Sequence, residues 1–335
     1  MEYREFGRTG IQISAMGLGC WEIGGGYGAI EADQFARAVQ RALDLGVNCF
    51  DTAEAYGFGA SERELARALG DRRSEAVVVT KFGIGYPERP RMRDSSPQQI
   101  ATSIEGSLKA LGSDYIDVYL VHWPDVNTPF DVTMRALEDI VTQGKARFVG
   151  VSNFRREQIE QCLQTRRIDV VQCGWNLFDR RMDREILPCC AENEIGVMAY
   201  GPLAYGMLTG TFSEDMEFAE GDWRAGRGNM GVINLARTLF GPGYFVKNVR
   251  AVEELKKIAA RYDKTVAQLA LRWAMTHPAV SVALAGCRNP EEVEENVGAF
   301  EFTLSEDDLA EIDAVFETQG IETAPNNWIE DDEEG

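Results

Sequence analysis

Four residues of types that can move or steer a proton lie at or near the ends of short apolar runs. Asp51 lies near the end of the run VNCFDT, and Tyr56 follows Asp51 by five residues. Lys81 lies at the end of AVVVTKF, and His122 ends IDVYLVH. A phenol has a pKa of about 10, which a nearby ammonium group lowers by stabilising the phenolate. Such a set suits a proton donor for a carbonyl oxygen that gains negative charge as it accepts hydride.

Each residue has a definite place in this hypothesis. Lys81 would supply the positive charge beside the Tyr56 phenol, and Asp51 would hold Lys81 in position. His122 would hydrogen-bond the reacting oxygen. Taken singly, however, an aspartate at a strand end is usually a cap, a lysine there reaches solvent, and a tyrosine packs its ring. The catalytic interpretation therefore requires a fold that brings all four side chains together.

Eight short apolar runs recur along the chain, and they are continuous rather than alternating, as in strands buried on both faces. They lie near residues 15–20, 47–52, 76–82, 116–122, 147–152, 169–174, 195–200 and 280–286. Helical patterns separate them, so the order predicts a parallel sheet with helical crossovers. Eight such units closing on themselves give a (β/α)8 TIM barrel. An open doubly wound sheet is the alternative.

Helix starts are predicted from capping residues. In SERELARALG, Ser61 is the expected N-cap and Glu64, three residues later, completes a capping box. In SPQQIATSIEGSLKALG, Ser96 is the expected cap and Gln99 completes the box. Both predictions place a helix directly after a strand that carries a candidate catalytic residue.

Three other segments complete the predicted architecture of a single barrel domain over residues 1–335. REFGRTGIQIS, before the first barrel strand, is expected to form a β-hairpin that caps the barrel floor. A stretch of about 203–247 lacks a clear helix and is far longer than most loops, which indicates a functional loop. The acidic tail of about 318–335 is expected to fray.

In a (β/α)8 barrel the active site forms at the C-terminal ends of the strands. The predicted strand ends carry the four proton-handling residues and, in later strands, Ser152, Asn153, Gln172 and Tyr200. The barrel prediction therefore brings all of these side chains to one mouth.

The chain resembles the aldo-keto reductase family over nearly its whole length. The resemblance rests on GLGCW at 17–21, FDTAEAYG at 50–57, TKFG at 80–83, YIDVYLVHWPD at 115–125, GKARFVGVSNF at 144–154, AYGPLAYGMLTG at 199–210 and GCRNPEEVEEN at 286–296. It implies the (β/α)8 barrel and a nicotinamide cofactor bound without a Rossmann domain. It also implies that Tyr56 is the proton donor, that Lys81 and Asp51 tune it, and that His122 orients the carbonyl.

The resemblance further implies where a cofactor binds. The nicotinamide carboxamide would be held by Ser152, Asn153 and Gln172, and the ring would stack on Tyr200. The implied pyrophosphate contacts are Gly201, Leu203, Gly206 and Leu208, and Trp21 is a further expected cofactor contact. The implied adenosine site consists of Gly286, Arg288, Glu292, Glu295 and Asn296.

The adenosine end bears on the choice between the two cofactors. Arg288 could pair with a 2′-phosphate, which favours NADP(H). Glu292 would repel that phosphate and would suit free ribose hydroxyls, as acidic residues do in NAD sites. NADP(H) is the favoured cofactor and NAD(H) the alternative.

Aromatic residues near the predicted strand ends suggest a substrate pocket. Trp21, Tyr27 and Trp123 are its candidate walls, and such walls suit sugars, aryl aldehydes and ketones alike. The segment GGGYGA at 24–29 also matches a dinucleotide-binding pattern, but a lone match is weak evidence. We expect a small-molecule carbonyl or alcohol substrate.

Composition excludes several other functions. The net charge of -20 argues against nucleic acid or an anionic membrane as the main partner. No apolar run is long enough to span a bilayer, and the N-terminus lacks the apolar core of a signal peptide. The seven cysteines show no CxxC spacing, which indicates reduced thiols of a cytoplasmic protein. With only two histidines, a His-rich metal centre is not expected.

Three functions are therefore in competition. The leading hypothesis is an NAD(P)(H)-dependent oxidoreductase acting on an aldehyde, ketone or sugar, or on the corresponding alcohol. The alternative is a non-catalytic accessory or sensor subunit that binds nucleotide on the same fold. An isomerase or aldolase with Lys81 as a Schiff-base amine is the weakest, because it gives Tyr56 no role.

Overall fold

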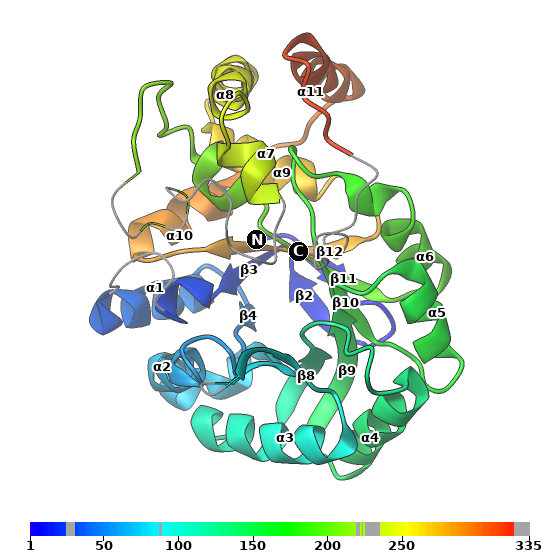
Figure 1. Ribbon diagram of the computed structural model, residues 1–335. Helices are drawn as coiled ribbons and strands as arrows, with labels where there is room; N and C mark the ends of the chain where they lie inside the picture. The colour runs from blue at the N-terminus through cyan, green and yellow to red at the C-terminus, as the bar shows by residue number, and fades with distance from the viewer. Residues whose placement is uncertain (25–30, 87–88, 219–221, 223, 225–234, 325–335) are drawn as a thin grey trace.

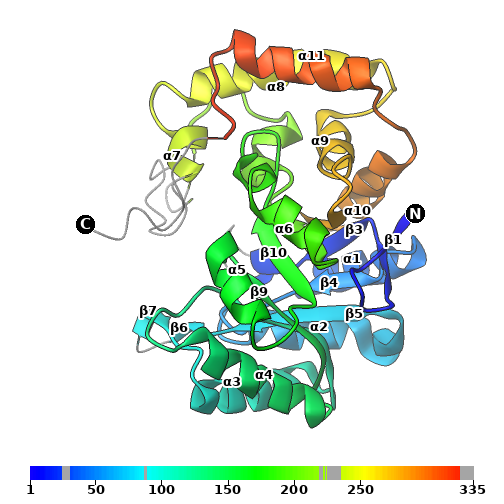
Figure 2. The ribbon, with the colours of Figure 1, turned by 90° about the vertical axis from the view of Figure 1, so that its right-hand side faces the viewer.

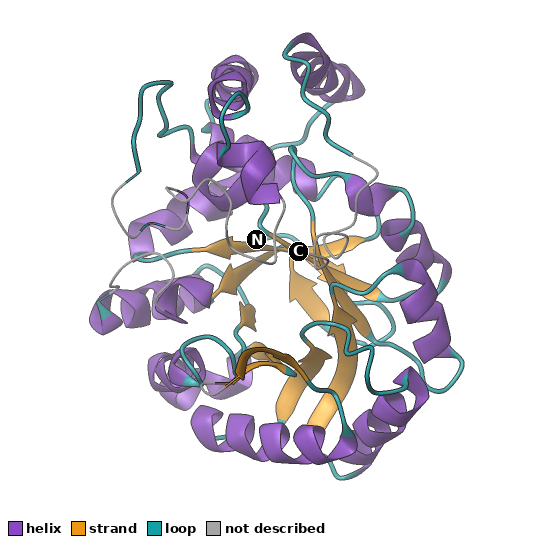
Figure 3. Cartoon of the chain, in the orientation of Figure 1, coloured by secondary structure: helices purple, strands orange, loops and turns teal. Residues whose placement is uncertain are grey.

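A computed structural model of the chain describes residues 1–24, 31–86, 89–218, 222, 224 and 235–324. Eight parallel strands form a closed barrel in the order β10-β11-β12-β3-β4-β5-β8-β9, with helices around the outside (Figures 1 and 3). The strands are β3 (Met16–Gly19), β4 (Cys49–Asp51), β5 (Val77–Phe82), β8 (Ile116–Val121), β9 (Ala146–Ser152), β10 (Val170–Gly174), β11 (Gly196–Tyr200) and β12 (Val280–Gly286). The predicted barrel is confirmed, and the open sheet is excluded.

The barrel interior is filled by alternate residues of each strand. In β5, Val77 and Val79 belong to the interior apolar cluster, so Lys81 is the next residue on the inward face. The same period places Asp51 above Cys49 in β4. The apolar layers end at the mouth, where polar side chains take the inward positions.

The barrel floor is closed by the N-terminal hairpin of β1 (Tyr3–Glu5) and β2 (Gln12–Ser14). Phe6 and Ile13, from the hairpin, are fully buried in the interior cluster with Val77 and Val170. Phe6 also lies against Gly196, where the carbon of any larger side chain would stand 2.5 Å from the Phe6 ring. The predicted floor hairpin is confirmed, and it leaves only the opposite end of the barrel open for a site.

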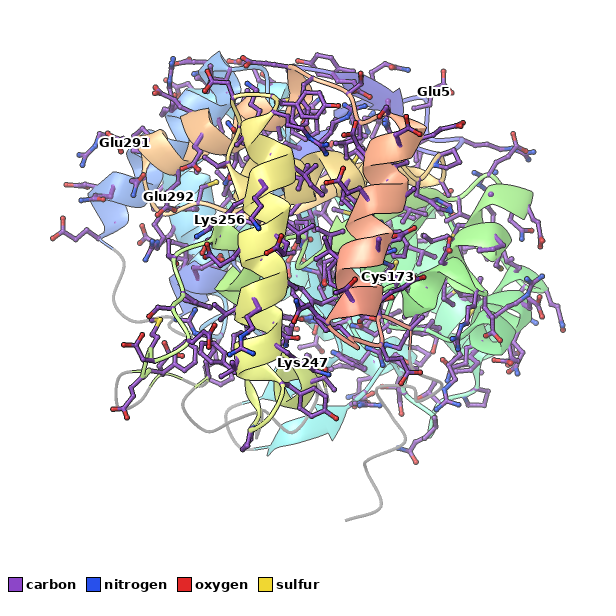
Figure 4. All side chains as sticks on the ribbon, turned by 90° about the horizontal axis from the view of Figure 1, so that it is seen from above. Glu5, Cys173, Lys247, Lys256, Glu291 and Glu292 are labelled. Atoms are coloured by element: carbon purple, nitrogen blue, oxygen red, sulfur yellow. The ribbon has the colours of Figure 1, made fainter. Side chains whose placement is uncertain are left out.

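The helices that follow the strands cover the outside of the barrel. They are α1 (Ala32–Asp44), α2 (Ala60–Leu69), α3 (Pro97–Leu111), α4 (Phe130–Thr142), α5 (Arg156–Leu163), α6 (Ile186–Glu192), α7 (Leu235–Phe240), α8 (Phe245–Ala260), α9 (Val266–Ala274), α10 (Pro290–Val297) and α11 (Glu306–Thr318). Helices α8 and α11 pack side by side, as the view in Figure 4 shows. In the described part of the chain, we find no helix with the length and apolar character needed to cross a membrane.

The predicted capping box at Ser61 is wrong. Helix α2 begins at Ala60 after Gly59, whose φ of 80° suits glycine, so Ser61 already lies inside the helix. The Ser61 hydroxyl donates to the Cys20 carbonyl (2.8 Å) and accepts from the Thr52 hydroxyl (2.9 Å). Ser61 therefore joins the ends of β3 and β4 and does not cap a helix.

The predicted cap of α3 is confirmed in part. The Ser96 hydroxyl accepts from the Gln99 amide, as expected. The Gln99 side chain, however, donates to the Ser103 hydroxyl (2.9 Å) instead of completing a box.

Three segments outside the barrel differ from a simple strand–helix alternation. A second hairpin, β6 (Ile84–Tyr86) and β7 (Arg89–Arg93), follows β5 and projects from the barrel in Figure 2. The long segment of about 203–247 contains the 3-10 helix η4 (Ala204–Thr209) and α7, and α8 begins within it at Phe245. The tail after α11 is anchored at its start, because the Thr323 carbonyl accepts from the Arg180 amide (2.6 Å).

Candidate active site

The inward positions at the mouth bring the four predicted catalytic residues together. Lys81 lies at the centre, and its Nζ donates to Asp51 Oδ2 (2.8 Å), to the Thr52 carbonyl (2.8 Å) and to the Tyr56 hydroxyl (3.3 Å). Lys81 has no solvent exposure, and the Asp51 side chain is 6% exposed. The ammonium group is thus fixed by three oxygen atoms in a dry environment.

Asp51 has a second partner that fixes its orientation. Gln172 Nε2 donates to Asp51 Oδ1 (2.7 Å), so each carboxylate oxygen accepts a different donor. Burial raises the pKa of Asp51, and the Lys81 charge opposes this. Gln172 was predicted as a cofactor contact, and the structure shows that its amide nitrogen also hydrogen-bonds a candidate catalytic residue.

Tyr56 is a neutral phenol in this setting. Burial raises its pKa well above the usual range, and the negative charges of Asp51 and Glu22 add to the effect. In the free protein, burial therefore outweighs the lowering of this pKa that was expected from the Lys81 charge. A neutral hydroxyl beside an ammonium group is a proton donor whose phenolate product would be stabilised by Lys81.

His122 lies against the Tyr56 ring, with ring centroids 5.7 Å apart in an edge-to-face arrangement. Burial lowers the pKa of His122 well below its usual range, and the nearby Lys81 charge acts in the same direction. The imidazole is therefore neutral and has one N–H to donate. Its Nδ1 atom is buried and has no hydrogen-bond partner among the described residues.

Behind His122, a hydrogen-bond chain joins three further predicted residues. The Asn153 amide nitrogen donates to the His122 carbonyl (3.0 Å) and to Ser152 Oγ (3.1 Å). The Tyr200 hydroxyl donates to Asn153 Oδ1 (2.8 Å). Asn153 holds a left-handed backbone with φ of 64°, which is tolerated by asparagine more than by most residues. The Asn153 side chain therefore links the C-terminal ends of β8, β9 and β11.

The polar groups at this point suit a carboxamide. Among the described residues, the Ser152 hydroxyl hydrogen and Gln172 Oε1 have no hydrogen-bond partner. They offer one donor and one acceptor, which match the oxygen and the nitrogen of a nicotinamide carboxamide. Tyr200 packs its ring against Gly174, where a side-chain carbon would stand 3.3 Å away. The residues present therefore fit a nicotinamide group.

The predicted pyrophosphate segment forms a tight, irregular turn after β11. Gly201 and Gly206 have φ values of 63° and 97°, which few other residues adopt. Leu203 precedes η4, in which Leu208 is fully buried. The segment therefore presents backbone at the mouth and anchors itself with an apolar side chain.

At the end of β12, the two residues predicted to choose the cofactor are paired with each other. Arg288 Nη2 and Nε donate to Glu292 Oε1 (2.7 and 3.1 Å), and the Arg288 amide donates to Glu292 Oε2 (2.8 Å). Figure 4 labels Glu292 on α10. The charge of Arg288 is thus partly neutralised in the free protein.

Of the other predicted adenosine contacts, two have structural partners. Asn296 is buried and donates to Cys287 Sγ (3.3 Å), and the Glu295 carbonyl accepts from Gln268 Nε2 (2.7 Å). The Glu295 side chain is exposed on α10. Gly286 ends β12 and is contacted by the carboxylate of Glu22.

The candidate substrate walls are only partly described. Trp21 begins the 3-10 helix η1 (Trp21–Gly24), and its ring lies 6.2 Å from that of Tyr205. Trp123 is buried, with the Arg93 guanidinium 5.0 Å from its ring centroid. Tyr27 lies outside the described residues.

Sequence reasoning missed three residues at the mouth, namely Glu22, Tyr205 and Arg93. Glu22 directly follows the GLGCW segment, so an acid beside a matched motif was a usable signal. Tyr205 comes from η4, and Arg93 comes from the unpredicted hairpin. No local pattern indicated where these two side chains would lie.

Comparison with known proteins agrees with this geometry. Residues 15–317 match the model of the Aldo/keto reductase family. The chain is 34% identical to the aldo-keto reductase YhdN of Bacillus subtilis over 95% of its length and 94% of the relative's. It is also 34% identical to the NADH-specific methylglyoxal reductase of Escherichia coli, covering 90% and 94% of the two chains.

A solved structure is similar as well. The glycerol dehydrogenase AKR11B4 of Gluconobacter oxydans superposes with a TM-score of 0.85 at 32% identity, covering 97% of this chain and 98% of that one. The family match across most of the barrel agrees with the polar arrangement at the mouth. The chain therefore belongs to the aldo/keto reductase family, and it is an oxidoreductase.

Proposed function

We propose that this protein transfers hydride between a nicotinamide cofactor and a small carbonyl or alcohol compound, with Tyr56 as the general acid or base. The observation that carries the proposal is the hydroxyl of Tyr56 held 3.3 Å from Lys81 Nζ, with the His122 ring against it. When bound, the cofactor supplies or accepts the hydride. The residues of this chain handle the proton and the oxygen.

In the reductive direction, a substrate carbonyl oxygen would lie between the Tyr56 hydroxyl and the neutral His122 imidazole. Both groups donate hydrogen bonds to the oxygen as it gains negative charge. Tyr56 then gives up its proton, and the Lys81 ammonium stabilises the phenolate that forms. The Asp51 carboxylate holds Lys81 in place throughout.

Ser152, Gln172 and Tyr200 would hold the nicotinamide end, and the turn from Gly201 to Leu208 would bind the pyrophosphate. The adenosine would lie near Arg288. NADP(H) is the favoured cofactor, and NAD(H) is the alternative. All seven cysteines are free thiols, which supports a reducing, cytoplasmic location.

The substrate class follows from relatives named for small polar compounds. One is named a methylglyoxal reductase and another a glycerol dehydrogenase. We propose aldehydes, ketones and sugars of this size as substrates, with Trp21 and Trp123 as pocket walls. The test measures the loss of NADPH or NADH absorbance with methylglyoxal as the substrate for reduction. For oxidation, it measures the absorbance of the NADPH or NADH that forms from NADP+ or NAD+ with glycerol.

The same assay, extended to aryl aldehydes and aldoses, distinguishes the proposed function from the alternative. Turnover that the Tyr56→Phe variant lacks supports the proposal. Tight nucleotide binding without turnover of any carbonyl or alcohol would instead indicate a non-catalytic nucleotide-binding subunit.

A further inference from the structure

A carboxylate outside the proposed catalytic set lies at the barrel mouth, beside the end of β12. Glu22, in η1, places its Oε1 at the position that a side-chain carbon would take on Gly286. A larger side chain at 286 would displace this carboxylate. Glu22 therefore lies on the end of β12, beside the segment that carries Arg288.

The groups on which the Glu22 charge acts lie at both ends of the proposed cofactor site. Its charge acts on Tyr56 and Cys20 at the catalytic end, and on Arg288 and Cys287 at the adenosine end. The proposed cofactor has its nicotinamide near Tyr56 and its adenosine near Arg288. The two phosphates that join these ends would then pass close to Glu22.

Among the described residues, no cation forms an ion pair with the Glu22 carboxylate, although the charge of Arg288 lowers its pKa. No hydrogen bond or ion pair joins it to another side chain among the described residues, and Arg288, which precedes α10, is occupied by Glu292. On α2, which packs against η1, Glu62 is bonded to Thr80. Arg63 of the same helix lies over Gly59.

Burial raises the pKa of Glu22 to about 7, and the charge of Glu292 contributes in the same direction. The side chain is partly exposed at the mouth, although its carboxylate is surrounded by protein. Near neutral pH the group is therefore divided between its neutral and its charged form.

We propose that Glu22 couples cofactor binding to proton uptake: the dinucleotide binds to the form in which this carboxyl is neutral. The inference rests on the proposed function, because it takes a nicotinamide dinucleotide as the ligand. The physical reason is that a second negative charge beside the pyrophosphate is unfavourable in a low-dielectric groove.

The direction of the pH effect follows from linkage. An anionic ligand raises the pKa of Glu22 further, so the bound protein holds more protons than the free protein. The affinity is constant below the free pKa, falls as the pH rises through about 7, and becomes constant again above the bound pKa. Between the two pKa values it falls by at most about tenfold per pH unit.

The experiment measures NADH binding by isothermal titration calorimetry from about pH 6 to 9. NADH is the probe because the 2′-phosphate of NADPH itself titrates at about pH 6 and would add its own proton uptake. Titrations in two buffers of different ionisation enthalpy give the number of protons taken up. This readout on the wild-type protein needs no variant.

Glu22→Gln is the test variant, and Glu291→Gln is the matched control, because Glu291 is an exposed acid on α10 next to Glu292 (Figure 4). We expect wild type and Glu291→Gln to take up protons near pH 7.5. Glu22→Gln should take up none and should bind NADH about tenfold more tightly at pH 8.

A pH-independent affinity of the wild type, or unchanged proton uptake by Glu22→Gln, overturns the inference. Weaker binding by Glu22→Gln at every pH would do so as well, since it would mean that the carboxylate accepts hydrogen bonds from the ligand. If the wild type binds neither NADH nor NADPH at any pH, the proposed function fails, and the inference fails with it.

Discussion

The Lys81 ammonium lies 3.3 Å from the Tyr56 hydroxyl, and the same ammonium is bonded to the buried carboxylate of Asp51. Positive charge is therefore held beside a neutral phenol before any substrate arrives. No group has to be repositioned when negative charge develops on the phenol oxygen, because the stabilising charge is already in place. The first two predictions test it.

Removing the Tyr56 hydroxyl should abolish most turnover without disturbing the fold. Tyr56→Phe keeps the ring against His122 and removes only the proton donor. General acid catalysis typically contributes 10²–10⁴-fold, or about 3–5 kcal/mol of the barrier. We expect kcat to fall by this factor with methylglyoxal or another good carbonyl substrate, while the cofactor dissociation constant is unchanged. Turnover like that of the wild type would remove Tyr56 from the mechanism.

Lys81 should act through Tyr56. Residues that work as a unit give non-additive losses, so Lys81→Met combined with Tyr56→Phe should be little worse than the worse single variant. A cycle of kcat values for the four proteins measures this coupling. Additive losses would show that Lys81 contributes by another route, such as binding the substrate.

The same lysine should matter for stability, because its removal leaves Asp51 buried without a counter-charge. Breaking a buried ion pair typically costs about 3–5 kcal/mol. We therefore expect Lys81→Met to unfold at much lower urea concentration. Adding Asp51→Asn should recover part of this loss, and no recovery would show that packing around Lys81, not charge, is responsible.

Much of the fold could be predicted from the sequence, because strands buried on both faces form continuous apolar runs. The candidate catalytic residues could be placed as well, because Asp51, Lys81 and His122 lie at or near the ends of these runs and Tyr56 follows one of them. The second hairpin could not, since Pro90 and alternating arginines give β7 the appearance of a loop. Bonds such as that from Gln172 to Asp51 join positions 121 residues apart, and no local pattern indicates them.

The Ser61 error has a similar origin. Serine followed three residues later by glutamate is typical of a helix start, but here a glycine with a left-handed backbone begins the turn earlier. The Ser61 hydroxyl is instead used between strand ends. A residue type that often caps helices can thus form tertiary hydrogen bonds instead, and the sequence alone does not distinguish the two uses.

The stacking role proposed for Tyr200 can be separated from its hydrogen bond. Tyr200→Phe keeps the ring and removes only the bond to Asn153, so cofactor affinity should change little. Tyr200→Ala removes the ring and should weaken binding by about 0.5–1.5 kcal/mol beyond the lost area. Cofactor titrations followed by protein fluorescence compare the two. Equal affinities of wild type and Tyr200→Ala would contradict the placement of the nicotinamide.

Glu62, a buried acid on α2, should make the stability of the protein depend on pH. Glu62 is 1% exposed and accepts a hydrogen bond from Thr80 (2.6 Å), and burial raises its pKa above the ordinary 4.5. Because the folded pKa is the higher one, the protein loses stability as the pH rises from the unfolded pKa to the folded pKa. Glu62→Gln should remove this loss, so it should gain stability relative to the wild type at neutral pH and not at about pH 4.

Urea unfolding at a series of pH values measures that difference. Glu64→Gln is the control, because Glu64 lies on the same helix with its side chain 35% exposed and paired with Arg67. The control should show no pH-dependent gain. A Glu62→Gln variant that is less stable than the wild type at every pH would mean that the charged form is the stabilising one.

The choice of cofactor should depend on which member of the Arg288–Glu292 pair meets the ribose. In the free protein Glu292 occupies the Arg288 guanidinium with two hydrogen bonds, so a 2′-phosphate must compete with a carboxylate for the same arginine. Glu292→Gln removes that competitor and its repulsion, and should lower KM for NADPH selectively. Arg288→Ala should raise KM for NADPH far more than for NADH. Steady-state kinetics with both cofactors measures each effect. If the wild type prefers NADH by more than about tenfold in kcat/KM, or roughly 1.4 kcal/mol, Glu292 outweighs Arg288 and NAD(H) is the cofactor.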